Sequence, residues 1–142
     1  MHETIRRRDA AQAAFDRFNG RALAWGRDDC LRLAAFDLRK MGRAVSLAKA
    51  GSYSSLAGAL RALRRTGFAT LAEAVDAEGL VRIPPAAALP ADLLGGTPHE
   101  GGPWVALGVV LGNGRVLGFQ NGFCGVLQPT PEDLATAIAW RV

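Results

Sequence analysis

The residues most able to carry chemistry stand together near the start of the chain. Cys30 follows two aspartates, Asp28 and Asp29, and opens an apolar stretch with helical spacing. Either aspartate can cap a helix, which we expect over residues 28–41, so the thiol falls in its first turn. Backbone N–H groups and the positive end of the helix dipole favour a thiolate at that place. Cys30 is therefore the candidate nucleophile, and Asp29 is its neighbour in the motif.

Three interpretations of Cys30 remain open from the residues alone. It can be a buried cysteine that packs as a small hydrophobic group, a reactive thiol, or a metal ligand. No Cys/His spacing supports a metal site, and we expect neither a metal nor a cofactor. The second cysteine, Cys124, lies far away in the sequence, and we do not expect the two to form a disulfide.

A cysteine nucleophile needs a base, and the chain has only two histidines, His2 and His99. His2 is close to the chain end, where fraying is common. His99 stands in a Pro- and Gly-rich segment, residues 97–102, which we expect to be an exposed loop. A base must be held in position by a third group, so such a loop is a poor support. A Cys30–His99 pair is kept as the alternative to an exposed loop histidine.

The pattern of apolar residues and caps predicts helices first and strands later. Helices are expected over residues 4–18, 28–41, 55–66 and 70–79, each closed by a turn or a glycine. Strands are expected over residues 104–111, 115–119, 123–128 and 139–142, with Asn-Gly turns between the first three and a short helix after Thr130. The proline-rich residues 83–85 and 90–103 are expected to be loop.

These elements indicate one α+β domain over residues 1–142, with a helical half at about 1–80 and a strand half at about 81–142. The length of 142 residues and the hydrophobic fraction of 49% suit a domain with its own core. A cysteine at the start of a helix, followed by an antiparallel sheet, suggests a papain-like layout. In that layout a histidine on the sheet accepts the proton of the thiol.

The charge pattern argues against two classes of partner. The net charge is +4, and the arginines cluster at residues 6–8 and 61–65 without interleaved aromatics. We therefore expect solvated helix faces and no nucleic-acid partner. The N-terminus is polar and charged, and no apolar run approaches about 20 residues, so we expect synthesis in the cytoplasm with no signal peptide and no membrane anchor.

Several short motifs resemble those of NlpC-type cell-wall peptidases, a papain-like superfamily that includes bacteriophage tail-tip members. Trp25-Gly26 followed by Asp29-Cys30 resembles the nucleophile motif, and residues 107–114 resemble the strand and glycine turn of the second motif. Residues 90–93 stand where the family often has a Gly-Asp pair. Residues 139–142 are similar to the ending of small phage proteins related to these peptidases. The resemblance covers roughly residues 20–142.

Two positions depart from the family pattern. The active family has a histidine two residues before the glycine that matches Gly108, and this chain has Ala106 there. A second polar residue, often histidine, follows about a dozen residues later in the family, at the position of Gly118. Loss of the base removes proton transfer to and from the reacting groups, which typically costs orders of magnitude in rate.

The resemblance and its departures imply a degenerate, non-catalytic NlpC-like domain that serves as a structural component of a phage or prophage tail tip. Its location would be the virion, and its partners would be hub and distal tail proteins, reached in part through the C-terminal strand. One alternative is an active cysteine peptidase or amidase that cleaves peptidoglycan peptides with Cys30. Another is a stand-alone module that binds cell-wall peptides without cleaving them.

Overall fold

The computed structural model describes residues 2–46, 52–96 and 104–142. Its centre is a six-stranded antiparallel sheet in the order β1-β6-β2-β3-β4-β5. The strands are β1 (Val81–Ile83), β2 (Leu93–Gly95), β3 (Leu107–Gly112), β4 (Arg115–Gln120), β5 (Phe123–Leu127) and β6 (Ile138–Arg141). The helices are α1 (Glu3–Phe18), α2 (Cys30–Lys40), α3 (Leu56–Arg65), α4 (Leu71–Asp76) and α5 (Pro131–Thr136), with a short 3-10 helix, η2 (Pro85–Ala87). The α+β class predicted from the sequence is confirmed.

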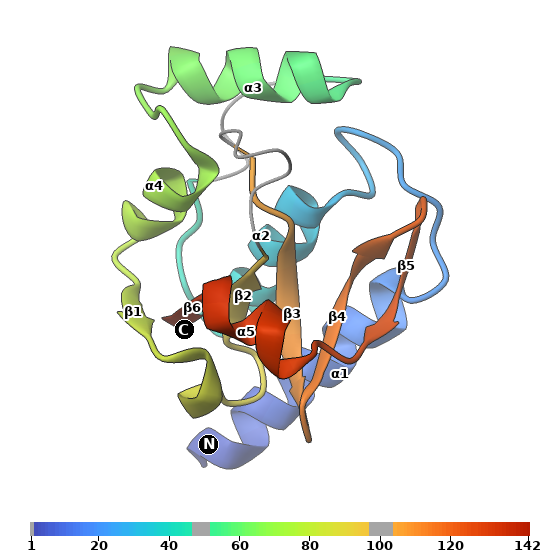
Figure 1. Cartoon of the computed structure of the whole chain (residues 1–142), viewed down its shortest axis with the longest axis vertical. Helices are drawn as coiled ribbons and strands as arrows, with labels where there is room; N and C mark the ends of the chain where they lie inside the picture. Colours follow the sequence, from blue (N-terminus) through green and yellow to red (C-terminus); the bar gives the residue numbers. More distant parts are fainter. Residues whose placement is uncertain (1, 47–51, 97–103) are drawn as a thin grey trace.

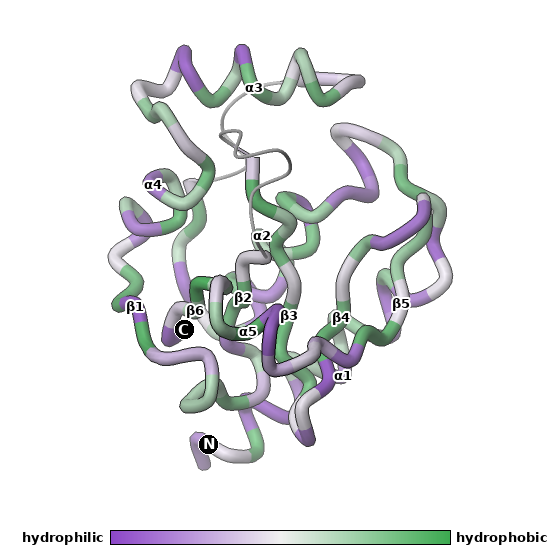
Figure 2. Tube along the Cα trace, viewed as in Figure 1, coloured by the Kyte–Doolittle hydropathy of each residue, from purple (hydrophilic) through white to green (hydrophobic). Residues whose placement is uncertain are grey.

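The helices lie on both faces of the sheet (Figure 1). Helices α1 and α2 pack on one face, while α5 crosses the other. Side chains of a strand alternate between faces, so Leu107 and Val109 of β3 join the main core with α1 and α2. Val110 joins a smaller cluster that Leu134 of α5 covers. Figure 2 shows hydrophobic residues along β3, at the centre of the sheet.

The helix starts follow from side-chain caps. Asp29 caps α2, Ser55 caps α3 and Thr70 caps α4, each by accepting a backbone N–H three residues further on. Thr130 caps α5 and forms a capping box with Asp133. The caps predicted at these positions are confirmed, because each polar residue stands where the first turn leaves donors unpaired.

The two predicted Asn-Gly turns are also confirmed. Asn113 joins β3 to β4 with a φ of 55°, and Asn121 joins β4 to β5 with a φ of 54°. Asparagine tolerates this left-handed region better than most residues, and a glycine follows each one. These hairpins set the register of β3, β4 and β5, of which β3 and β4 pack against α2.

The stretches predicted as loop contain β2 and the last residue of β1, which is a correction. Ile83 ends β1, and Leu93–Gly95 forms β2. Each is three residues long and pairs with β6, so its stability comes from a partner far away in sequence. Strand β6 lies between β1 and β2. The C-terminal strand is therefore paired on both sides, and it offers no free edge to a partner.

A second correction concerns Arg7, which was predicted on a solvated helix face. Arg7 is only 6% exposed and donates to Asp92 at 2.8 Å and to the Val142 carbonyl at 2.6 Å. The fully buried Asp92 also accepts from Leu89, Arg141 and the Val142 backbone N–H. This network joins α1 to β6 inside the protein.

Candidate functional site

Cys30 is the first residue of α2, as predicted, and Asp29 is the N-cap. The Asp29 carboxylate is completely buried and accepts the backbone N–H of Arg32 at 2.8 Å and that of Gly26 at 2.7 Å. A third donor is the hydroxyl of Tyr53 at 2.9 Å. Asp29 therefore serves as a structural cap that three donors satisfy.

The glycine of the Trp25-Gly26 pair is required by geometry. Gly26 has a φ of 88°, in the left-handed region. A Cβ there would collide with the Tyr53 carbonyl oxygen, so only glycine allows the two backbones to approach. The turn before α2 and the segment before α3 thus pack tightly together around Asp29.

Cys30 is part of the core, with 6% of its surface exposed. Burial raises the pKa of its thiol to about 11, and the charge of Asp29 adds to the rise. Hydrogen bonds from the Leu107 backbone and the Trp104 side chain act in the opposite direction but do not restore a low value. Desolvation outweighs the helix dipole, and Cys30 is held as a neutral thiol.

Helix α2 packs on β3, and the influence of the Leu107 backbone on the thiol places Cys30 against the beginning of this strand. Trp104, just before β3, packs edge to face on Trp25 with ring centroids 5.7 Å apart. The two indoles thus form an aromatic layer beside Cys30.

Ala106 and Gly118, the positions where the resemblance expects a base, lie on the face of the sheet opposite Cys30. Ala106 is exposed, and both residues line a trough of about 520 Å³ on the α5 face of the sheet. Cys30 does not line this trough; it shares the main core with Leu107 and Val109 on the other face. The thiol and the two substituted positions therefore do not meet in one cavity.

Of the two histidines, His2 lies within the described residues, and it serves as a helix cap. His2 caps α1, where its Nδ1 accepts the Thr4 backbone N–H at 3.3 Å. His99 lies outside the described residues, so the Cys30–His99 pair stays a prediction. Among the described residues both cysteines are free, and no three His, Cys, Asp or Glu side chains gather as metal ligands.

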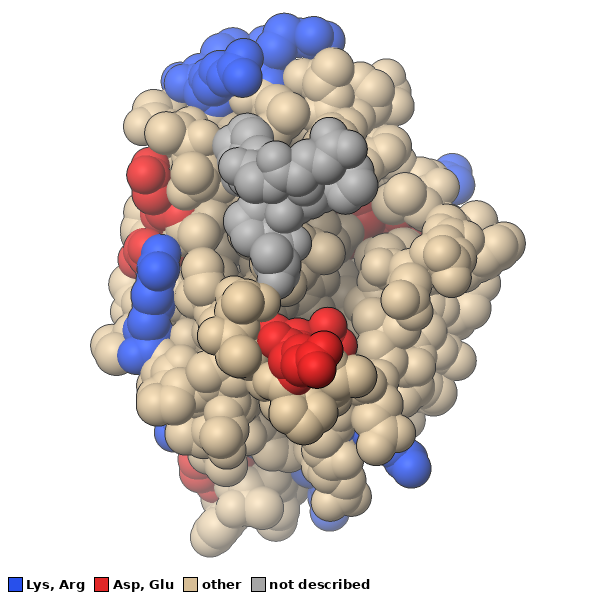
Figure 3. Space-filling model, in the orientation of Figure 1, with Lys and Arg blue, Asp and Glu red and all other residues tan. Residues whose placement is uncertain are grey.

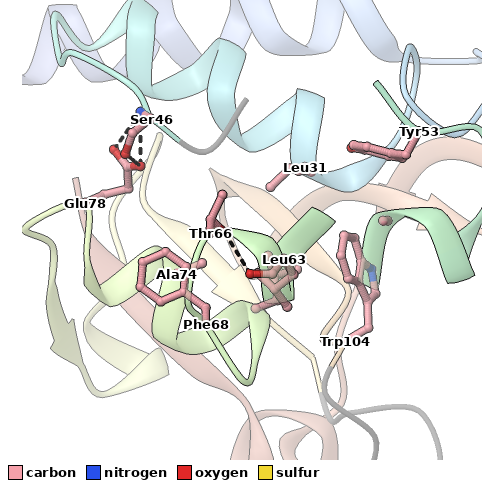
Figure 4. Close-up of a pocket in the computed structure, with 11 residues that line it drawn as sticks. Leu31, Ser46, Tyr53, Leu63, Thr66, Phe68, Ala74, Glu78 and Trp104 are labelled. Carbon is pink, nitrogen blue, oxygen red and sulfur yellow. Dashed lines mark hydrogen bonds between the residues drawn. The ribbon is translucent and has the colours of Figure 1, made fainter. Parts of the chain in front are cut away.

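A cavity that the sequence did not indicate lies beside the cysteine helix. It has a volume of about 260 Å³, and its described lining is mostly apolar. Leu31, Tyr53 and Trp104 stand at one end (Figure 4), and Ser46 hydrogen-bonds Glu78 at the other. No periodic pattern marks this cavity, because its walls come from α2, α3, α4 and the segment before β3.

Fold and site together define an α+β domain with a capped helix, a buried cysteine at its start and a six-stranded antiparallel sheet. A family model described as "Domain of unknown function (DUF6950)" matches residues 4–142, and the chain belongs to this family. No curated protein and no solved structure matches the chain. In its described parts, the chain has no helix with the length and hydropathy needed to span a membrane.

Proposed function

We propose that this protein is a non-catalytic structural component of a phage or prophage tail tip, built on a degenerate NlpC-like domain. The observation that carries the proposal is the state of Cys30. Its side chain is buried in the core, and burial raises the pKa of its thiol to about 11. A residue in this environment packs the core, and it does not present a nucleophile to a substrate.

The arrangement around the cysteine supports the loss of chemistry. A general base must come within hydrogen-bond reach of the proton that it removes. Ala106 and Gly118, where the resemblance expects a base, carry no ionisable group. Asp29, the nearest carboxylate in sequence, is occupied by three donors and raises the pKa of the thiol.

A domain that has lost its catalysis can still function by binding, because function depends on the sites that a fold carries. The trough on the α5 face offers a concave, mainly apolar surface. Figure 3 shows acidic side chains of α5 at the margin of this hollow, and arginines of α3 gathered at one end of the molecule. Surfaces of this kind suit contacts with neighbouring hub and distal tail proteins.

A second candidate is a module that binds cell-wall peptides without cleaving them. The cavity between Trp104, Tyr53 and Leu31 favours it, because an apolar pocket with a few polar groups is the usual form of a small-ligand site. The tail-tip proposal expects the protein in the phage particle, and this candidate does not require it there.

The test is quantitative mass spectrometry of purified phage particles from a strain that carries the gene, compared with a deletion strain. The proposal expects the protein in the particle at a fixed ratio to tail proteins, and particles with Cys30→Ala as infectious as wild type. Absence from the particle contradicts the tail role. Loss of infectivity by a folded Cys30→Ala protein contradicts the non-catalytic role.

A further inference from the structure

Strand β5 ends the sheet with an edge that is covered only in part. One side of β5 pairs with β4 along its length. On the other side, Cys124 donates its N–H to Arg21 and accepts from Gly20. Since strand residues alternate in the direction of their backbone groups, Val126 turns its N–H and C=O to this same side. No described residue bonds them there.

The uncovered part of the edge is also apolar. Val126 is 46% exposed. Sheet edges are usually protected by charge, proline or a covering segment, because an open edge invites another strand. The segment from Gly20 covers the beginning of β5 and stops before Val126.

Grooves flank this edge on both faces of the sheet. On the α5 side runs the trough of about 520 Å³, and Val126 and Leu127 form part of its lining. On the α1 side lies a groove of about 440 Å³, lined in part by Val126, Arg115 and Arg8. A strand added beside Val126 would direct alternate side chains into the two grooves.

The two grooves differ in chemistry. Arg115 is exposed and forms no ion pair with any described residue, and Arg8 pairs only with the neighbouring, exposed Asp9. The α1-side groove therefore attracts a carboxylate. The trough on the α5 side is lined by apolar side chains such as Leu134 and by Asp133. The carboxylate of Asp133 repels an acidic group, so an apolar side chain fits this trough better than an acidic one.

We propose that the open edge of β5 binds an extended segment of a partner protein in which acidic and apolar residues alternate. The segment continues the sheet through the backbone of Val126. Its acidic side chains meet Arg115 and Arg8, and its apolar side chains enter the trough. This inference goes beyond the proposed function, since such an edge serves an enzyme or a structural protein equally.

The test uses two fluorescein-labelled heptapeptides, one with alternating glutamate and valine and one with alternating lysine and valine. Fluorescence anisotropy with the full chain is expected to show binding of the acidic peptide at least about tenfold tighter than the basic one. In NMR spectra, the amides of Val126 and Gln128 are expected to shift on binding.

Three variants and a control locate the contact. Val126→Pro removes the outward N–H at an edge position where proline is tolerated, and it is expected to weaken binding about tenfold. Val126→Ala keeps the N–H and is expected to bind more tightly than the proline variant. Arg115→Glu is expected to reverse the peptide preference, while Arg43→Glu, at an exposed arginine after α2, keeps it.

The proposal is overturned if folded wild-type protein binds neither peptide. It is also overturned if Val126→Pro and Arg115→Glu both bind the acidic peptide as wild type does. Light scattering tests whether the protein self-associates as its concentration rises. If it does, and Val126→Pro abolishes the association, the occupant of the edge is a second copy of the chain, and the proposal of a partner segment is overturned. Thermal unfolding of each variant shows that lost binding is not lost folding.

Discussion

The Tyr53 hydroxyl donates to the Asp29 carboxylate across 2.9 Å inside the protein. This hydrogen bond links the segment before α3 to the N-cap of α2. It also gives Asp29 its third donor, beside the N–H groups of Gly26 and Arg32. Asp29, beside the cysteine, thus has a structural role. Burial, together with the charge of Asp29, raises the pKa of Tyr53.

A double-mutant cycle measures the coupling free energy between Tyr53 and Asp29. Tyr53→Phe is expected to lower the free energy of unfolding by about 1–2 kcal/mol, because it removes one hydrogen bond from a buried carboxylate. Asp29→Ala is expected to cost about 2–4 kcal/mol, because it removes the cap and leaves three donors without their acceptor. Urea unfolding of both single variants and the double variant should show a combined cost below the sum. Additive costs would mean that the two residues stabilise the protein independently.

The ion pair between Arg7 and Asp92 allows a second test of the fold. Arg7→Met is expected to cost about 3 kcal/mol, because the buried Asp92 would lose one of its two arginine partners and keep only Arg141. Arg8→Met is the matched control on the same helix and is expected to stay within about 0.5 kcal/mol, since Arg8 is exposed. Equal effects of the two substitutions in urea unfolding would show that Arg7 is not buried.

Asp37 predicts a pH dependence of stability. Both of its carboxylate oxygens are buried without a hydrogen-bond partner in the described structure. Burial raises the pKa of Asp37 well above its usual value, the nearby Asp92 raises it further, and Arg7 opposes the rise. The folded state therefore binds this proton more tightly than the unfolded state, and its contribution to stability falls as pH rises from about 4 through the folded pKa.

Asp37→Asn removes this titration. We expect the variant to gain stability relative to wild type on going from pH 4 to pH 8. The measurement is urea unfolding of both proteins at the two pH values, so that other titrating groups cancel in the difference. A stability difference that is the same at both pH values would show that Asp37 is ionised in the folded protein.

Local chemistry made most helices and hairpins predictable. Asp29, Ser55, Thr70 and Thr130 cap helices because their side chains satisfy donors a few residues away, so the signal is contained in a short stretch. The turn at Asn113 is local in the same sense. The helix start that holds Cys30 followed from these rules.

The missed features depend on partners far away in sequence. Strands β1 and β2 are short and are formed by pairing with β6, so proline-rich neighbours concealed them. Arg7 pairs with Asp92, 85 positions later, and nothing in its own helix distinguishes it from exposed arginines. The high pKa of Cys30 likewise comes from burial beneath Trp104 and Leu107, which outweighs the helix start.

The thiol itself can be probed by alkylation. With a pKa of about 11, only about one Cys30 in a thousand is ionised at pH 8, and its small exposure restricts access further. We expect native protein to react with iodoacetamide at Cys30 at least about 100-fold more slowly than protein unfolded in urea. Peptide mass spectrometry separates Cys30 from Cys124, which is also buried. Rapid, selective labelling of Cys30 in the native protein would contradict an unreactive, protonated thiol.

The most direct test of the central claim, that Cys30 carries no chemistry, is release of peptides from purified peptidoglycan by wild-type protein and by Cys30→Ala. Ala106→His is added because its histidine would begin on the α5 face of the sheet, in the trough that Cys30 does not line. We expect no release above buffer by any of the three, with a known cell-wall peptidase as positive control. Release by wild type that disappears in Cys30→Ala would contradict it, and His99→Ala would then show whether that histidine is the base.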